Sequence, residues 1–215
     1  MNKSYIGIVA ILSFILIACQ KKEEASKVSD RKQLFTENWK FYKNDTIKSL
    51  NEALNANAWQ AIDLPHDWSV YQEFDENSSA GIGGGALSGG VGYYKKSFNI
   101  PVEDSARLHK IQFDGVYQNS EVWINGSYLG KRPNGYIGFE YDLTPYLNFG
   151  SKDNTIVVKA DNSDQPNSRW FSGSGIYRNV WLKKLSKIHI PNWGTFITTP
   201  HISEKKALVN ITAEI

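Results

Sequence analysis

The stretch Val122-Trp-Ile-Asn-Gly-Ser-Tyr-Leu129 places the dipeptide Asn125-Gly126 between two apolar runs. Asn-Gly accepts the positive φ angles of a type I′ turn, whose twist matches that of two antiparallel strands. We therefore predict a two-residue β-hairpin here. Because successive side chains of a strand point to opposite faces, we expect Trp123 on the face opposite Val122 and Ile124.

The same two-residue periodicity recurs on both sides of this hairpin. Turn residues separate the apolar stretches at close intervals, so the sequence predicts an all-β protein built around an antiparallel jelly-roll sandwich. The best helical candidate, Ile47–Ala56, contains Asn and Ser residues that weaken a helix. The predicted strands are Trp59–Ile62, Tyr93–Ile100, Leu108–Phe113, Ser120–Ile124, Ser127–Lys131, Phe139–Leu143, Asn154–Ala160 and Arg178–Leu185.

The strand pattern restarts after Leu185, in Ile188–Ile197 and Ala207–Ile215. These two runs look like the first strands of an immunoglobulin-like sandwich, which needs about a hundred residues. We therefore expect the jelly roll to be followed by a truncated immunoglobulin-like β-sandwich. The predicted organisation is a leader at 1–18, a polar tether at 19–33, the jelly-roll domain at 34–186 and the partial second domain at 187–215.

The first nineteen residues resemble a bacterial lipoprotein signal. Lys3 gives a positive start, Ile6–Ile17 is an apolar run, and the small residue Ala18 precedes Cys19, the single cysteine of the chain. The run is too short for a mature membrane helix. We predict that cleavage leaves a lipidated Cys19 that anchors the protein in the outer membrane; the alternative is an ordinary buried cysteine.

The distribution of charge predicts a solvated tether after Cys19 and argues against nucleic acid as a partner. The Lys21-Lys22-Glu23-Glu24 run is polar, and such runs resemble surface-export signals, although a periplasmic orientation stays open. The chain has 24 Lys and Arg against 22 Asp and Glu, a net charge of +2. Loss of residues 1–18 removes Lys3 and leaves 23 against 22, or +1. A nearly neutral chain lacks the basic footprint of nucleic-acid binding.

The stretch Asp161-Asn-Ser-Asp-Gln-Pro-Asn-Ser-Arg-Trp-Phe-Ser-Gly-Ser-Gly-Ile-Tyr-Arg178 combines carboxylates, amides, Arg and aromatic residues beside Gly-rich turns. Polar groups that converge beside aromatic faces suit sugars. The run Arg169–Arg178 resembles the segment that closes the N-terminal, galactose-binding-like domain of glycoside hydrolase family 2, particularly its β-galactosidase group. Leu64–Trp68 and Phe113–Gly126 resemble two further motifs of that family, so the resemblance covers roughly residues 35 to 215.

The resemblance implies a retaining glycosidase that uses two Glu side chains about 5 Å apart. Those residues lie on a (β/α)₈ barrel that follows the immunoglobulin-like domain, so no catalytic residue is expected in this chain. We therefore expect an N-terminal fragment, inactive alone, that contacts a β-galactoside-type glycan. The alternative is a free-standing carbohydrate-binding surface lipoprotein without enzymatic activity.

Several properties stay open at this stage. The β-galactosidases, β-glucuronidases and β-mannosidases of the family share the first domain, so the resemblance does not fix the sugar or its linkage. It also leaves open the oligomeric state of the full-length enzyme and its use of Na⁺ or Mg²⁺. No cofactor is expected in this chain itself.

The resemblance also indicates candidate substrate-binding residues. In the related β-galactosidases an Asp shortly before the Trp contacts the sugar. Here the nearest Asp is Asp164, while Asn167 lies closer to Trp170. The candidates are therefore Asp164, Asn167, Arg169 and Trp170. The alternative is that Arg169 and Trp170 hold an interface with other domains, since interfaces also use Arg and Trp anchors.

Other conspicuous residues have structural explanations. We expect Asp67 to cap backbone amides and Trp68 to fill the core, rather than to contact sugar. Arg178 is expected to pair with a carboxylate of the scaffold. The Gly-rich run 80–92 lacks the Lys-Ser/Thr of a phosphate loop, so we expect a mobile loop at the mouth of the sandwich.

Two further groups of polar residues offer alternatives. Tyr117, Gln118 and Asn119 are expected to satisfy local backbone, with sugar contact as the alternative. The acidic run Glu73, Asp75 and Glu76 has no nearby His, so a solvated loop is expected rather than a metal site.

Overall fold

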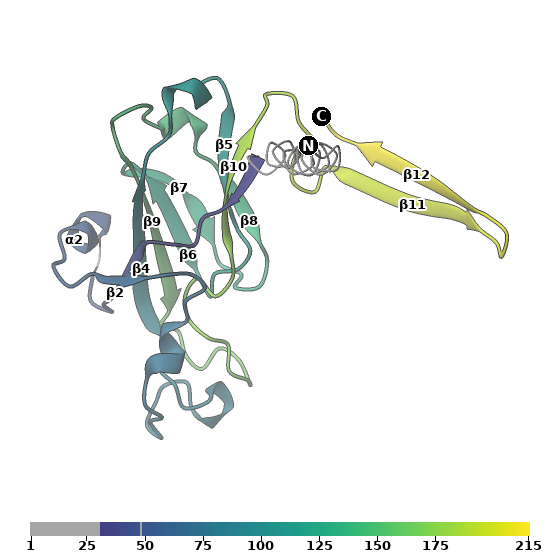
Figure 1. Cartoon of the computed structure of the whole chain (residues 1–215). Coiled ribbons are helices and arrows are strands. Elements are labelled where there is room, and N and C mark those ends of the chain that lie inside the picture. The colour runs from purple at the N-terminus through teal and green to yellow at the C-terminus, as the bar shows by residue number, and fades with distance from the viewer. Residues whose placement is uncertain (1–30, 48) are drawn as a thin grey trace, which may run out of the picture.

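The structure is a computed structural model that describes residues 31–47 and 49–215. The predicted leader, Cys19 and most of the predicted tether lie outside the described residues. Within the described part, two antiparallel sheets face each other to form a β-sandwich, and a hairpin extends away from it (Figure 1). No helix in this part has the length and apolar character needed to span a bilayer.

Ten strands form the sandwich. The six-stranded sheet has the order β3-β2-β4-β9-β6-β7, and the four-stranded sheet has the order β1-β10-β5-β8. The strands are β1 Lys32–Leu34, β2 Trp39–Lys43, β3 Gln60–Ile62, β4 Gly90–Phe98, β5 Leu108–Phe113, β6 Ser120–Ile124, β7 Ser127–Arg132, β8 Phe139–Asp142, β9 Asn154–Asn162 and β10 Val180–Leu185. The all-β prediction is confirmed, although β1 and β2 were not predicted.

Short helices connect these strands. The only α-helix among the described residues is α2, Leu50–Leu54, inside the weak helical candidate, and Ser49 Oγ caps it by accepting from the Glu52 amide at 3.2 Å. Four 3₁₀ turns complete the connections: η2 Trp68–Tyr71, η3 Ile82–Gly84, η4 Val102–Asp104 and η5 Thr144–Tyr146.

The predicted hairpin is present as β6 and β7. Asn125 and Gly126 have φ angles of 50° and 84°, as a type I′ turn requires, and Ile124 pairs with Ser127. Val122 and Ile124 are fully buried, whereas Trp123 is half-buried on the opposite face. The predicted turn, register and facing are therefore confirmed.

The core lies between the two sheets and is filled by alternate residues of facing strands. In β5 the burial alternates along the strand, with Ile111 and Phe113 fully buried. They belong to one core cluster with Val122 and Ile124 of β6 in the opposite sheet. Apolar burial of this kind is the main favourable contribution to folding.

The chain after the sandwich forms the hairpin of β11 (Thr195–Ile202) and β12 (Ala207–Ala213). Two strands were predicted after Leu185, and the first begins seven residues later than Ile188 because the Pro191–Gly194 turn precedes it. Its large side chains, including Phe196, Ile197 and Ile211, are exposed. The assignment to an immunoglobulin-like domain stays a prediction.

Candidate functional site

The candidate residues follow β9, on a loop that returns to the sandwich at Ser174–Ile176. Asn162, the last residue of β9, is 2% exposed and organises this loop through its side-chain amide. Its Nδ2 donates to Gly173 O at 3.0 Å and to Ser174 Oγ at 2.8 Å. Its Oδ1 accepts from Gln165 Nε2 at 2.8 Å and from Asn167 Nδ2 at 2.7 Å. One buried amide thus fixes both ends of the loop.

Asp67 joins the loop to the η2 turn. Its Oδ1 accepts hydrogen bonds from the amides of Ser69 and Ser174, each at 2.9 Å. Burial raises the pKa of the Asp67 carboxyl, and these amide hydrogen bonds oppose that rise because they stabilise the charged form. The capping role predicted for Asp67 is confirmed.

The two residues beside Asp67, His66 and Trp68, also have structural roles. Trp68 is 4% exposed, and its Nε1 donates to Gly89 O at 3.0 Å. His66 Nδ1 lies 2.9 Å from the Tyr94 hydroxyl, and burial lowers the pKa of His66. His66 therefore faces Tyr94 and forms no hydrogen bond with Asp67 among the described residues.

Gly175 allows the loop to approach the core closely. Its φ is +115°, and a Cβ there would lie 2.1 Å from the Tyr94 hydroxyl oxygen and 2.9 Å from His66 O. The residue exchanges two backbone hydrogen bonds with Tyr117, at 2.8 and 2.9 Å. Only glycine combines this backbone conformation with this contact.

The Gly-rich run packs against the candidate residues. A Cβ on Gly83 would lie 3.6 Å from the Arg169 Cα, and one on Gly85 would lie 3.5 Å from the Phe171 ring. Ser88 O accepts from Ser69 Oγ at 3.1 Å and from Gln72 Nε2 at 2.9 Å. The glycines thus permit close backbone approach, and the mobility of this loop stays a prediction.

The four candidate residues are all exposed, but they differ in their partners. Asn167 donates to Asn162 Oδ1 and to Asp164 O at 2.9 Å, while its Oδ1 accepts from the Tyr117 hydroxyl at 3.2 Å. The carboxylate of Asp164 and the guanidinium of Arg169 have no hydrogen-bond or ion-pair partner among the described residues. Asp164 and Arg169 are thus the two candidates with free charged groups.

Trp170 is 60% exposed, and its orientation is fixed by a residue that the sequence reasoning missed. Its Nε1 donates to the Tyr136 hydroxyl at 3.1 Å. Tyr136 is held in turn by Asn134, whose Oδ1 accepts from the Tyr136 amide at 2.8 Å, and by ring contact with Tyr117 at 5.4 Å. In the sequence, the Asn134-Gly135 dipeptide predicts a turn directly before Tyr136.

Together these residues suit binding rather than bond cleavage. An aromatic face can stack on the C–H face of a sugar ring, while the neighbouring carboxylate and guanidinium bind its hydroxyl groups. The acidic run at Glu73, Asp75 and Glu76 is exposed, and Asp75 Oδ1 accepts from the Asn77 amide at 2.9 Å. The described residues contain no group of three metal-binding side chains.

Comparisons with known proteins match the chain to one family of glycosyl hydrolases. Residues 37–186 match the family described as glycosyl hydrolases family 2, sugar binding domain. The chain is 47% identical to a β-galactosidase of Bacteroides ovatus, over 89% of this chain and 22% of that protein. It is 39% identical to a putative β-glucuronidase of Formosa agariphila, over 96% of this chain and 20% of that protein.

Solved structures show the same arrangement of strands. A glycosyl hydrolase family 2 member from Bacteroides cellulosilyticus matches with a TM-score of 0.74 and 36% identity, over 84% of this chain and 24% of that one. A β-glycosidase from Bacteroides vulgatus matches with a TM-score of 0.70 and 38% identity, over 86% and 24%. The chain therefore spans about a fifth to a quarter of the length of these relatives.

Proposed function

Because the chain belongs to glycoside hydrolase family 2, we propose that it is the sugar-binding part of a β-galactosidase-like or β-glucuronidase-like hydrolase. The observation that carries this proposal is the exposed indole of Trp170, which is held by a hydrogen bond to Tyr136 and belongs to the same loop as the unpaired charged side chains of Asp164 and Arg169. Of the two curated relatives described above, the β-galactosidase is the more similar. A β-galactoside is therefore the first substrate to test.

Trp170 is suited to stacking because its ring is already oriented. The hydrogen bond to Tyr136 reduces the rotamer freedom that the indole would otherwise lose when a sugar binds. Asp164 and Arg169 then supply an acceptor and a donor for hydroxyl groups at the edge of the same sugar. Asn167 acts differently, since its amide already forms two hydrogen bonds inside the loop and a third with the Tyr117 hydroxyl. We propose that it contributes by positioning Asp164 and Arg169.

We propose that this chain binds saccharide but does not cleave it. Retaining hydrolysis needs two carboxyl groups about 5 Å apart, one as nucleophile and one as acid/base. We assign neither role to a described residue. Incubation of the purified chain with a chromogenic β-galactoside should release no chromophore, and measurable hydrolysis that survives repurification would contradict this proposal.

A second candidate is a carbohydrate-binding lipoprotein without hydrolase activity. The sandwich supports it because its core cluster is formed by residues of this chain. The gene separates the two candidates. A reading frame that continues past Ile215 into a barrel with two Glu residues at strand ends supports the hydrolase, whereas a stop codon at that point supports the binding protein.

We also propose that lipidated Cys19 attaches the protein to the outer membrane. The support is the sequence Leu16-Ile17-Ala18-Cys19 at the end of an apolar leader. A Cys19→Ala variant should move from the membrane fraction to the soluble fraction and should not incorporate labelled fatty acid. Unchanged membrane retention and labelling would contradict the proposal.

A further inference from the structure

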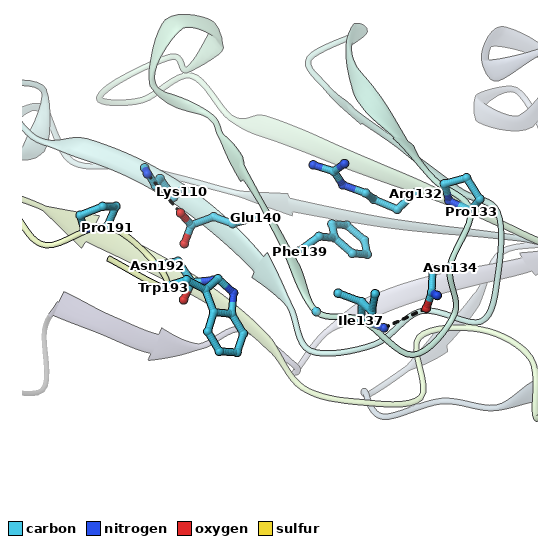
Figure 2. A pocket seen from close by; sticks show the side chains of 11 residues that line it. Lys110, Arg132, Pro133, Asn134, Ile137, Phe139, Glu140, Pro191, Asn192 and Trp193 are labelled. Carbon is cyan, nitrogen blue, oxygen red and sulfur yellow. Dashed lines mark hydrogen bonds and ion pairs between the residues drawn. The ribbon is translucent and has the colours of Figure 1, made fainter. Parts of the chain in front are cut away.

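A groove beside the four-stranded sheet is not used by the function proposed above. It consists of two adjoining hollows of about 540 Å³ each. Both are lined by Ile137, Gly138, Asn192 and Trp193. Figure 2 shows the first hollow, in which Asn192 and Trp193 of the turn before β11 lie next to Glu140 of β8.

Trp193 occupies an unusual position for its size. It is 88% exposed, and its φ of +65° is a left-handed conformation that bulky residues rarely adopt. The residue lies in a tight turn closed by a hydrogen bond from the Gly194 amide to Pro191 O at 3.0 Å. Strained conformations of this kind concentrate at ligand sites. An indole displayed in this way is available for stacking.

The groove also carries excess positive charge. The Glu140 carboxylate binds both Lys110, at 3.1 Å, and Lys183, at 2.6 Å, so one negative charge serves two positive charges. Arg132 lies 5.6 Å from the centre of the Tyr141 ring and, like the exposed Arg178, forms no ion pair among the described residues.

The lining of the groove holds three positively charged side chains, Lys110, Arg132 and Arg178, against two carboxylates, those of Glu140 and Asp114. Asp114 forms no ion pair among the described residues. Its carboxylate accepts from Trp181 Nε1 and Gln112 Nε2, each at 2.7 Å. The expected pairing of Arg178 with a scaffold carboxylate is therefore wrong. Asp114, which lines the same hollow as Arg178, instead accepts hydrogen bonds from Trp181 on β10 and Gln112 on β5.

Exposed aromatic and apolar residues connect this groove to the candidate site. Tyr136 lines the second hollow and is 52% exposed, and its hydroxyl accepts from Trp170 Nε1. Ile137, 64% exposed, lines both hollows beside Trp193. The surface thus presents a continuous track made up, in this order, of Trp170, Tyr136, Ile137 and Trp193. Spaced aromatic rings with polar side chains between them suit a chain of sugar rings.

We propose that the groove binds an anionic glycan chain, with Trp193 stacked on one sugar ring and Arg132 and Arg178 paired with its carboxylate or sulfate groups. Arginine suits this role because its planar fork binds such groups with two hydrogen bonds. The inference rests on the proposed function for the class of ligand, a saccharide. It adds a second binding region that accepts negatively charged sugars.

Titration calorimetry on the 215-residue chain tests this proposal. The probes are an oligogalacturonate, a sulfated galactan oligosaccharide and a neutral galacto-oligosaccharide of equal length. At low salt we expect the preferred anionic probe to bind about tenfold more tightly than the neutral one, as one charge-assisted pair predicts. Added NaCl should reduce this difference because salt screens exposed charges. Comparison of the two anionic probes identifies carboxylate or sulfate as the preferred group.

Variants locate the binding. Trp193→Ala and Arg178→Gln should each weaken binding of the preferred anionic probe by about fivefold or more. Tyr128→Ala and Lys152→Gln are matched controls at exposed positions away from the groove, and both should leave the affinity unchanged. All four side chains are exposed, so thermal unfolding should show that the variants remain folded.

Either of two results would overturn the proposal: equal affinity for neutral and anionic probes, or unchanged affinity in Trp193→Ala. The result is separable from the proposed function. Binding of a short neutral β-galactoside should depend on Trp170 and not on Trp193, so loss of one type of binding does not imply loss of the other.

Discussion

The loop from Asn162 to Arg178 has a buried part and an exposed part that serve different purposes. In the buried part, Asn162, Ser174 and Gly175 join β9, η2 and the Tyr94 side chain through hydrogen bonds and close packing. In the exposed part, the side chains of Asp164 and Arg169 have no partner among the described residues, and Trp170 presents its ring to solvent. The same short sequence thus supplies both a scaffold and the surface that the scaffold displays.

This difference explains why the stretch identifies a family better than it identifies a sugar. Several of its residues, among them Gly173 to Ile176, are buried. The packing of the sandwich requires these residue types, whichever sugar the protein binds. The exposed residues are free to vary with the ligand. Substitutions in the buried part should therefore change stability, and substitutions in the exposed part should change binding.

Gly175→Ala should have the largest effect on stability. The new Cβ would lie 2.1 Å from the Tyr94 hydroxyl oxygen at a φ of +115°, so the loop or the core must move. We expect a loss of about 3 kcal/mol or more in the free energy of unfolding, measured by urea denaturation. Gly126→Ala is the matched control, because its φ is also positive but no atom lies within 4 Å of the added Cβ. It should cost about 1 kcal/mol. Equal losses would show that the contact with Tyr94 is unimportant.

Asn162→Ala should follow, with a loss of about 2 to 3 kcal/mol in the free energy of unfolding. The change removes the Asn162 donor from the buried Ser174 hydroxyl and Gly173 carbonyl, and it removes the Asn162 acceptor from Gln165 and Asn167. Asn167→Ala, in the same loop but exposed, should cost about 1 kcal/mol. If Asn167→Ala is the more damaging variant, the loop is organised from its exposed side instead.

The stability of the buried region should fall as the pH is lowered. Burial lowers the pKa values of His66 and His109, so the folded state favours neutral imidazole in both. Below the unfolded-state pKa of about 6.5, the unfolded chain binds protons that the folded chain does not. The free energy of unfolding should therefore decrease from pH 7.5 to 5.5.

His109 provides the sharper variant for this pH dependence. Its two ring nitrogens are buried without a hydrogen-bond partner in the described structure. His109→Leu should therefore flatten the pH profile relative to the unmodified chain. His201→Leu is the control at an exposed position and should leave the profile unchanged. A profile that is equally steep in His109→Leu would contradict the assignment.

Arg169→Gln should have the smallest effect on stability. The side chain is exposed and unpaired among the described residues, so we expect a change within about 0.5 kcal/mol in the free energy of unfolding. Affinity for a β-galactoside should nevertheless fall in calorimetric titration. A large loss of stability would favour the alternative in which Arg169 holds a structural contact.

Much of the fold could be predicted from sequence because its signals are local. The Asn125-Gly126 turn and the alternation in β5 and β6 depend only on neighbouring residues. The strand β2 carried a signal that was overlooked, since Trp39 and Phe41 are buried and Lys40 is exposed. The strand β1 gave no such signal, because all three of its residues are exposed and only pairing with β10 defines it.

The candidate site was less predictable because its contacts join distant parts of the chain. The start of β4 was missed because Gly90 and Gly92 resemble a loop in sequence. In the structure a Cβ on Gly92 would lie 2.6 Å from the Trp68 ring, so packing requires the glycine. Likewise, the 2.7 Å hydrogen bond between Ser69 and Ser174 spans 105 residues, and no local pattern announces it. For Tyr136, the Asn134-Gly135 dipeptide indicates a turn, but nothing local indicates the hydrogen bond from Trp170, 34 residues later.

The division between scaffold and surface is tested by measuring stability and saccharide affinity on Trp170→Ala and Asn162→Ala side by side. Trp170→Ala should keep its free energy of unfolding within about 0.5 kcal/mol and lose about fivefold or more in affinity for a β-galactoside. Asn162→Ala should lose about 2 kcal/mol or more of stability. If Trp170→Ala instead loses as much stability as Asn162→Ala and binds the sugar with unchanged affinity, then Trp170 belongs to the scaffold and the proposed sugar contact is wrong.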